Sequence, residues 1–280
     1  MAIRNRIQQR LSTYSRLAVW GAGGLGRTAM RYWLPREKIV LAVDSNPSAS
    51  KLLGQCPVCL PDAADFSGVD AIVICTSVHL EVLHDLRARG FVGPVFYIYE
   101  LFLPDNDTKL TELQALAVDI AATKNDSWLR FLFLKPQILV NVTFRVGNWA
   151  SESAWRLPLY WVFFVLHAFA CVIFSIQLPL KTPIGPGLIF AHYGTIVFTR
   201  RANIGSFFTI YHGCTVGTND SGEGPTIGNF VYQYAGSHVL GRCRIGDRSR
   251  IGANAVVLDV ECGPESTLVG IPARVITRND

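Results

Sequence analysis

Apolar residues recur at every sixth position through the last hundred residues of the chain. From residue 227 the series runs through Ile227, Val239, Ile245, Ile251 and Val257, and only Gln233 interrupts it. Upstream the same step runs through Ile184 and Phe190 and, after a slip of two residues, through Phe198, Ile204, Ile210 and Val216. A period of six fits neither an α-helix nor plain strand alternation, and it predicts a parallel β-helix of hexapeptide coils over residues 184–280. No single hexad buries its own apolar side chain, so stacked coils must form the core.

Residues 1–104 carry a different pattern, in which short apolar runs alternate with helical stretches. Strands are predicted at 17–20, 39–43, 71–75 and 95–98, and helices at 27–33 and 79–89. This alternation predicts a parallel sheet in a small Rossmann-like α/β unit.

A glycine-rich turn follows the first predicted strand. Gly21, Gly23 and Gly26 fit G-x-G-x-x-G, a pattern that permits a tight turn, close approach of a phosphate and close packing of helix on strand. Asp44 ends the second strand, where an acid that binds a ribose is expected. Two interpretations stay open: this unit binds a nucleotide or nucleotide-linked sugar, or it is a relic that binds nothing tightly.

Residues 105–183 form an apolar bridge between these two parts. A turn at 105–107 and a helix at 109–122 are predicted first. Residues 157–180 are 24 positions without a charge, flanked by Arg156 and Lys181, and this length is enough to cross a bilayer. A single crossing would separate two domains that both look cytosolic. We therefore expect a hairpin or a peripheral membrane attachment, with a packing helix of a soluble protein as the alternative.

The overall composition indicates a folded protein rather than a disordered or nucleic-acid-binding one. Half of the 280 residues are hydrophobic and 17% are charged, and the net charge of +5 is scattered without a dense basic run. Seven cysteines, an odd number, suggest reduced thiols. Cys56 and Cys59 have no second pair at metal-site spacing, so we expect incidental thiols in a loop and no metal. The start lacks a secretory apolar segment, so we expect a cytoplasmic protein, and the apolar stretch 157–180 would hold it at the inner face of the cell membrane.

Three segments of the β-helix region identify a family resemblance. They are IGPGLIFAHYGTIVF, FTIYHGCTVG and RIGANAVVLDVECGPESTLVGIPARVI. The region resembles the left-handed β-helix acyltransferases, most closely the serine acetyltransferase branch with its exopolysaccharide O-acetyltransferase relatives. The resemblance covers about the last hundred residues and implies a homotrimer that uses acetyl-CoA. The first domain resembles the small N-terminal domain of sugar N-acetyltransferases that act on nucleotide sugars.

The resemblance assigns the general base to His192, which falls at the slip in the hexad count. In the family, a His at this place takes the proton of the acceptor hydroxyl as that oxygen attacks the thioester of acetyl-CoA. Imidazole suits this role because its ordinary pKa lies near neutrality. His212 is a second candidate, either orienting His192 or contacting the acceptor, or else serving as a structural residue.

The sequence departs from the serine enzymes at two places. They carry an acid immediately before the base, where this chain has Ala191, and a second essential His in a loop that is here 217–225 and contains none. Both departures affect residues that grip serine or assist its activation. The resemblance also implies contacts with acetyl-CoA from small residues of successive coils and from the closing GIPAR motif, here Ala235, Gly252, Ala253, Pro272 and Arg274.

Together these features predict an acetyl-CoA-dependent O-acetyltransferase that acts on a sugar hydroxyl in surface polysaccharide biosynthesis. The acceptor is expected to be a lipid-linked or nucleotide-linked saccharide. The alternatives are serine O-acetylation, N-acetylation of a nucleotide-activated amino sugar, and an inactive β-helix scaffold.

Overall fold

The computed structural model describes residues 2–46, 52–76, 78–104, 109–123 and 135–276. They form two compact units. The described residues up to 104 belong to the first, and residues 109–123 together with 135–276 belong to the second. The helices of the predicted bridge are thus part of the same unit as the β-helix, while its predicted turn at 105–107 lies outside the described residues.

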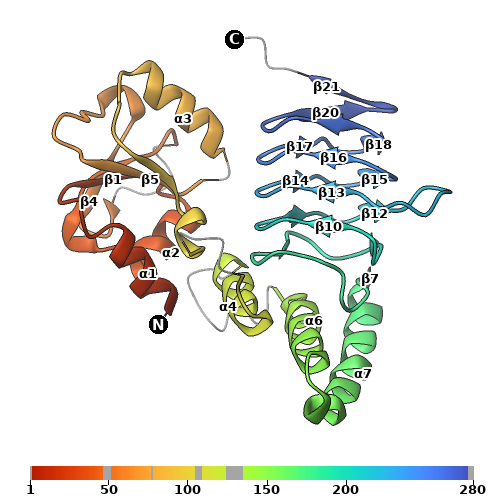
Figure 1. Ribbon diagram of the computed structural model, residues 1–280. Helices are drawn as coiled ribbons and strands as arrows, with labels where there is room; N and C mark the ends of the chain where they lie inside the picture. Colours follow the sequence, from red (N-terminus) through yellow and green to blue (C-terminus); the bar gives the residue numbers. More distant parts are fainter. Residues whose placement is uncertain (1, 47–51, 77, 105–108, 124–134, 277–280) are drawn as a thin grey trace. The chain divides into compact units, whose positions relative to one another are not determined.

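The first unit is built on one six-stranded sheet (Figure 1). Its strands, in the order in which they lie side by side, are β3 (Leu52–Leu53), β4 (Cys56–Cys59), β2 (Ile39–Val43), β1 (Leu17–Trp20), β5 (Ala71–Ile74) and β6 (Val95–Tyr97). Only β3 and β4 pair antiparallel. The helices are α1 (Ala2–Arg10), α2 (Gly24–Tyr32) and α3 (His79–Ala88), with 3-10 turns at Arg36–Lys38, Pro61–Ala63 and Glu100–Phe102.

The mainly parallel sheet of the first unit confirms the prediction of a parallel sheet. Its central strands show why short apolar runs predicted these strands. All four residues of β1 and of β5 are buried, as expected for strands covered on both faces. The structure differs at one edge, where Cys56 and Cys59 lie in strand β4 and not in the predicted loop. Their short hairpin contains Pro57 and lacks an alternating apolar pattern, so the sequence carries little strand signal there.

In the second unit, helices α4 (Glu112–Thr123), α6 (Ile138–Ser151) and α7 (Leu157–Phe174) precede the β-helix, with a 3-10 turn at Ala154–Arg156. Helix α6 packs between α4 and α7. The uncharged stretch is not one element: α7 stops at Phe174, and Ser175 adopts a left-handed conformation (φ 52°) that turns the chain into the first β-strand. Residues 154–174 are long enough for a membrane span, and their most apolar stretch of 18 residues has a mean hydropathy of 2.2, with 17% of that stretch buried.

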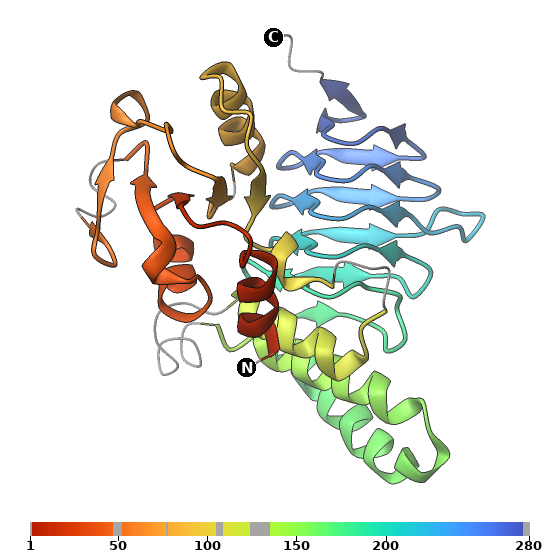
Figure 2. The same cartoon turned by 60° about the vertical axis from the view of Figure 1, so that its left-hand side comes forward.

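The β-helix has three walls, seen edge-on as stacked coils in Figures 1 and 2. The first wall contains β10 (Asn203–Ile204), β13 (Thr226–Ile227), β16 (Arg244–Ile245) and β19 (Glu261–Cys262). The second contains β8 (Ile189–Phe190), β11 (Thr209–Ile210), β14 (Tyr232–Gln233), β17 (Arg250–Ile251), β20 (Thr267–Gly270) and β21 (Ala273–Ile276). The third contains β7 (Ile176–Gln177), β9 (Ile196–Phe198), β12 (Thr215–Gly217), β15 (His238–Leu240) and β18 (Val256–Leu258). Neighbouring strands are parallel except for β20 and β21.

The residues that recur every six positions line the interior of this prism. All eleven apolar members of the series are at most 8% exposed: Ile184, Phe190, Phe198, Ile204, Ile210, Val216, Ile227, Val239, Ile245, Ile251 and Val257. Gln233 also points inward and is fully buried, with its Nε2 donating to the carbonyls of Thr215 (3.1 Å) and Ser237 (3.0 Å). The predicted parallel β-helix and its core are therefore confirmed.

Candidate active site

The candidate catalytic and acetyl-CoA-binding residues lie at one corner of the prism, between the second and third walls. Phe190 pairs with Ile210, Ile210 with Gln233, and Gln233 with Ile251 across successive coils. The residues two positions further on therefore occupy the same place in four successive coils; they are His192, His212, Ala235 and Ala253. We call this column the histidine corner.

The lowest coil is wider at the histidine corner than the coils above it. Phe190 and Phe198 pair with Ile210 and Val216, so eight residue steps in the lowest coil match six in the next. The two extra residues are the slip in the hexad count. They leave His192 exposed and place Gly194 (φ 112°) and Thr195 (φ 52°) in left-handed conformations that turn the chain back to the wall.

His192 and His212 are neighbours on successive coils, with their rings edge to face, and both are exposed to solvent. Their ring centroids are 5.8 Å apart with planes at 75°, and the ring of Tyr211 lies 5.7 Å from that of His192. The structure therefore brings the two predicted catalytic residues together. At this separation either ring can contact an acceptor bound to the other.

Aromatic rings flank the two histidines. Tyr211 packs against Tyr234 of the next coil at 5.3 Å, and Tyr193 packs edge-on against Phe174 at the end of α7 at 5.4 Å. Burial, with a smaller contribution from Tyr234, raises the pKa of Tyr211, so its phenol is neutral at pH 7. Tyr211 and Tyr234 were missed from the sequence, although both directly follow an inward-pointing residue at this corner.

The residues assigned to acetyl-CoA continue the histidine corner upward. Ala235 and Gly252 are half-buried and Ala253 is exposed. Because Ile251 pairs with Leu268, the next place in the column is taken by Gly270, the first residue of GIPAR. Pro272 and Arg274 are exposed, with Arg274 opposite Val269 in the closing β20–β21 hairpin. The predicted set thus forms one continuous strip with the histidines.

The shortened loop at 217–225 lies at a different corner, between the third and first walls. Asn219 donates to Asp259 (3.2 Å), the Arg201 guanidinium donates to the carbonyl of Gly222, and the Asn219 carboxamide oxygen accepts from the backbone N–H of Glu223 (3.1 Å). Within one chain, this loop adds no histidine and no side chain to the histidine corner.

Cys214 is not a nucleophile in this geometry. It is fully buried in the prism, and its thiol donates to the carbonyl of Tyr234 at 3.1 Å. Among the residues that the structure describes, no group of three or more His, Cys, Asp or Glu side chains is arranged to hold a metal ion.

In the first unit, the glycine-rich turn lies at the carboxyl end of β1. Gly21 has φ 112°, and a Cβ on Gly26 would lie 1.8 Å from the Gly21 carbonyl oxygen, so these two positions require glycine for the fold. A Cβ on Gly23 would meet nothing within 4 Å. The Asp44 carboxylate accepts the backbone N–H of Ala22 (2.6 Å), which brings the predicted ribose-binding acid onto the turn.

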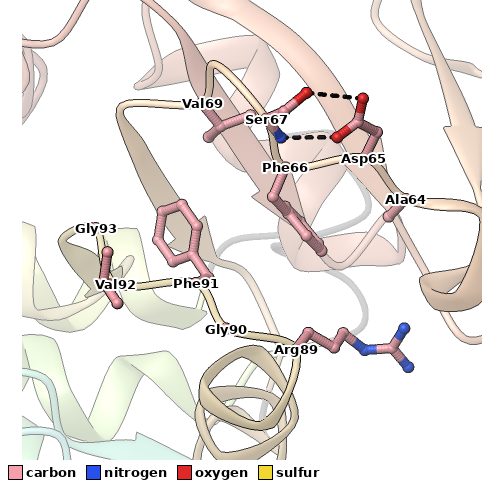
Figure 3. Close-up of a pocket in the computed structure, with 10 residues that line it drawn as sticks. All are labelled: Ala64, Asp65, Phe66, Ser67, Val69, Arg89, Gly90, Phe91, Val92 and Gly93. Carbon is pink, nitrogen blue, oxygen red and sulfur yellow. Dashed lines mark hydrogen bonds between the residues drawn. The ribbon is translucent and has the colours of Figure 1, made fainter.

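A cavity of about 580 Å³ in the first unit lies away from that turn (Figure 3). Its lining comes from the segments that lead into β5 and β6, at the opposite end of the strands. Arg89 is engaged by Asp85 and Asp62, both at 2.9 Å, and Asp65 accepts both the N–H and the hydroxyl of Ser67 at 2.8 Å. Its charged groups are therefore already paired, and none of the predicted nucleotide-binding residues lines it.

Two further residues reach the lowest coil from the segment before α6 and were missed from the sequence. Lys135 Nζ donates to the carbonyl of Ala191 (3.1 Å), and Gln137 Nε2 donates to that of Phe190 (3.2 Å). The available signal for Gln137 was the recurrence of polar side chains at four-residue spacing, at Gln137, Asn141 and Arg145.

Known proteins match more than half of this chain. Residues 224–259 match the family model described as bacterial transferase hexapeptide (six repeats). A serine acetyltransferase of Helicobacter pylori strain J99 is 41% identical over 152 residues, covering 53% of this chain and 85% of that protein. One of Mycobacterium tuberculosis strain H37Rv is 31% identical over 172 residues, covering 59% and 73%. The soybean serine acetyltransferase apoenzyme matches with a TM-score of 0.50 at 27% identity, covering 64% and 74%.

These relatives confirm the left-handed β-helix acyltransferase class that the sequence predicted. They do not support the exopolysaccharide branch, so the saccharide acceptor and a role in polysaccharide biosynthesis remain proposals, as does a Rossmann-like assignment for the first unit. Three findings support the same family: the hexapeptide match, the 41% identity over most of the H. pylori protein, and the similarity of the fold to the soybean enzyme. The chain belongs to the serine acetyltransferase family of hexapeptide-repeat transferases and is an acetyl-CoA-dependent acyltransferase.

Proposed function

We propose that the protein transfers the acetyl group of acetyl-CoA directly to an acceptor hydroxyl, with His192 as general base. One observation carries this proposal: His192 and His212 share a single corner with the small residues Ala235 and Ala253. Coils about 4.8 Å apart place Ala253 roughly 14 Å along the column from His192. An extended thioester arm lying on Ala235 and Ala253 therefore reaches the histidines with its acyl end.

The chemistry needs one base at the acyl end. His192 removes the acceptor's hydroxyl proton as the oxygen attacks the thioester carbonyl carbon. The tetrahedral intermediate collapses with cleavage of the carbon–sulfur bond, and the imidazolium returns the proton to the departing thiolate. The products are the acetyl ester and free CoA, and no acyl-enzyme forms.

Thiol release from acetyl-CoA measures the reaction. His192→Asn is expected to lower kcat by at least ~100-fold, the usual contribution of a general base, while the far-UV circular dichroism spectrum is unchanged. His238→Gln is the matched control, because His238 lies on β15, outside the histidine corner, and we expect it to stay near wild-type turnover. Near-normal turnover of the His192 variant would overturn the assignment.

Serine is the first acceptor to assay, because the relatives that match most of their own length are serine acetyltransferases. A specific observation favours a second candidate, a saccharide hydroxyl. The corner residues 191–194, 211–213, 234–236 and 252–254 include no acid to pair with an amino group, and Tyr211 and Tyr234 offer ring faces that suit a sugar. Turnover with L-serine against a panel of methyl glycosides and UDP-linked amino sugars separates the candidates.

We also propose a homotrimer, in which the strip from Ala235 to Arg274 faces a neighbouring prism. This arrangement is supported by the family resemblance and by the exposure of Ala253, Pro272 and Arg274 on a single prism. Light scattering after gel filtration is expected to give three times the chain mass of 30.9 kDa; a monomer with full activity would refute it.

For the first unit we propose a Rossmann-like domain, over residues 1–104, that binds a nucleotide or nucleotide-linked sugar. The strand order β4-β2-β1-β5-β6 reverses at β1, and the glycine-rich turn and Asp44 lie at the carboxyl ends of β1 and β2, where such sheets bind ligands. Calorimetry with UDP tests this. Gly23→Val has room to fold but fills the space that a phosphate needs, so it is expected to abolish binding.

The uncovered side of α7 supports a peripheral contact with the inner face of the cytoplasmic membrane. Phe169 and Val172 are 63% and 78% exposed, and the exposed Lys181 follows the apolar stretch with a charge suited to anionic lipid. The protein is expected to sediment with phosphatidylserine vesicles. Phe169→Glu/Val172→Glu should lose this binding, and Val92→Glu, at a 91% exposed site of the first unit, should keep it.

A further inference from the structure

The lowest coil of the β-helix needs hydrogen-bond donors that the coils above it do not need. In the coils above, backbone carbonyls of the first and second walls accept hydrogen bonds from backbone N–H groups of the coil below. The N–H of Ala191 donates to the carbonyl of Ile210 (2.9 Å), and the N–H of Gly185 donates to the carbonyl of Ile204 (2.8 Å). Strand β8 is the terminal strand of its sheet in the described part of the chain. The Pro186 carbonyl accepts the N–H of Phe207 in the coil above (2.9 Å), but the carbonyls of Ile184, Leu188 and Phe190 lie on the open edge, where the described part of the chain has no further coil.

Side chains of α6 take the place of that missing coil. Asn141 Nδ2 donates to the carbonyl of Leu188 (2.9 Å), and Arg145 Nη1 donates to that of Ile184 (2.9 Å). Gln137, just before the helix, donates to Phe190 (3.2 Å). Spaced by four residues, these three side chains lie on one stripe of the helix. We call them the capping stripe.

The upper end of the capping stripe lies next to the base. Gln137 is 2% exposed, and its donor holds the carbonyl two residues before His192. Lys135 Nζ holds the next carbonyl, that of Ala191, and its burial lowers the pKa of its ammonium group. From the other side, the N–H of Ala191 donates to Ile210. The backbone is thus held by hydrogen bonds on both sides immediately before the widened corner that carries His192.

We propose that Lys135 and Gln137 are positioning residues that fix the backbone from which His192 reaches the acceptor hydroxyl. The inference rests on the proposed function of His192. Without these two donors, the widened corner has few constraints on its N-terminal side. Displacement of a catalytic group by about 1 Å costs on the order of 100-fold in rate, so even partial loss of these hydrogen bonds must appear in kcat.

The test compares the two donors next to His192, Lys135 and Gln137, with two polar residues further along α6, Asn141 and Asn148. Lys135→Met and Gln137→Met keep side-chain volume and remove the donors, and each is expected to lower kcat by about 10-fold with an unchanged KM for acetyl-CoA. Lys135→Arg keeps a donor and is expected to recover most of kcat. Asn141→Leu and Asn148→Ala, further along α6, are controls expected to lower the melting temperature while leaving kcat at 25 °C near wild type.

The outcomes separate this inference from the function on which it rests. Wild-type kcat in both Met variants overturns the positioning role, as does an equal kcat loss in the Asn141 and Asn148 controls, because that result indicates general loosening. If the Lys135→Met protein does not fold, Gln137→Met and Lys135→Arg still decide the question. Full activity of His192→Asn would refute the base itself, whatever the Met variants show.

Discussion

Removing the Arg145 side chain is expected to destabilise the second unit strongly. Its guanidinium is 1% exposed and donates to Asp119 (2.9 Å), Glu112 (3.1 Å) and the carbonyls of Ile184 (2.9 Å) and Gly185 (2.6 Å). Burial alone would lower the pKa of Arg145, but the charges of Asp119 and Glu112 outweigh it and raise the pKa. The cation is therefore held between two carboxylates and the open edge of the β-helix.

Arg145→Met leaves the fully buried carboxylate of Asp119 without its cation. Breaking a buried pair from one side costs about 3–5 kcal/mol, a large share of the ~5–15 kcal/mol by which domains are stable. Chemical unfolding followed by circular dichroism measures the loss. Arg242→Met is the control, since Arg242 lies 4.0 Å from Glu223 on the surface and such pairs contribute at most about 1 kcal/mol.

The double variant Asp119→Leu/Arg145→Met tests the capping role itself. Replacing a buried pair by apolar residues is often neutral. Here Asp119 also accepts the N–H groups of Gly187 (2.6 Å) and Leu188 (3.0 Å), so both partners serve backbone groups that would lose them. We expect the double variant to be no more stable than Arg145→Met. Recovery to wild-type stability would refute the claim that these helices satisfy the edge of the β-helix.

Three further predictions concern other parts of the chain. Gly26→Ala is expected to destabilise the first unit by more than ~3 kcal/mol in chemical unfolding, because its Cβ would lie 1.8 Å from the Gly21 carbonyl oxygen. Gly23→Ala is the control, because its Cβ meets open space and the free energy of unfolding should stay within about 0.5 kcal/mol of wild type. Similar losses in the two variants would contradict this reasoning. Burial lowers the pKa of His167 below its ordinary value of about 6.5, so the unfolded chain binds more protons, and stability should fall as the pH drops below that value. His167→Gln should flatten this dependence between pH 7.5 and 5.5, and an unchanged slope would exclude His167 as its source. Arg274→Ala should raise the KM for acetyl-CoA by roughly 10-fold with kcat retained, the effect of losing one charged hydrogen bond to phosphate, and an unchanged KM would remove Arg274 from the cofactor strip.

The six-residue period predicted the β-helix well because it reflects the geometry of a coil. Each hexad makes one wall, so the inward positions from Ile184 to Val257 could be read without knowing any partner. The slip before Phe198 likewise predicted where the coil widens around His192. Stacking of Ala235 and Ala253 above the histidines required the register between coils, which the observed pairing supplied.

The helices before the β-helix were less predictable. Their length and apolar character were evident, but the role of Gln137, Asn141 and Arg145 depends on backbone carbonyls some forty or fifty residues later in the chain. No local pattern states which carbonyls lack a neighbour. Tyr211 and Tyr234 at the histidine corner could not be predicted for the same reason, because their contact joins separate coils.

A crystal structure of the protein with CoA tests the central claim most directly. The account predicts that the thiol arm lies along Ala235 and Ala253 and that its sulfur comes within hydrogen-bonding reach of the His192 ring. CoA bound at another corner of the prism, with its sulfur far from His192, would contradict it.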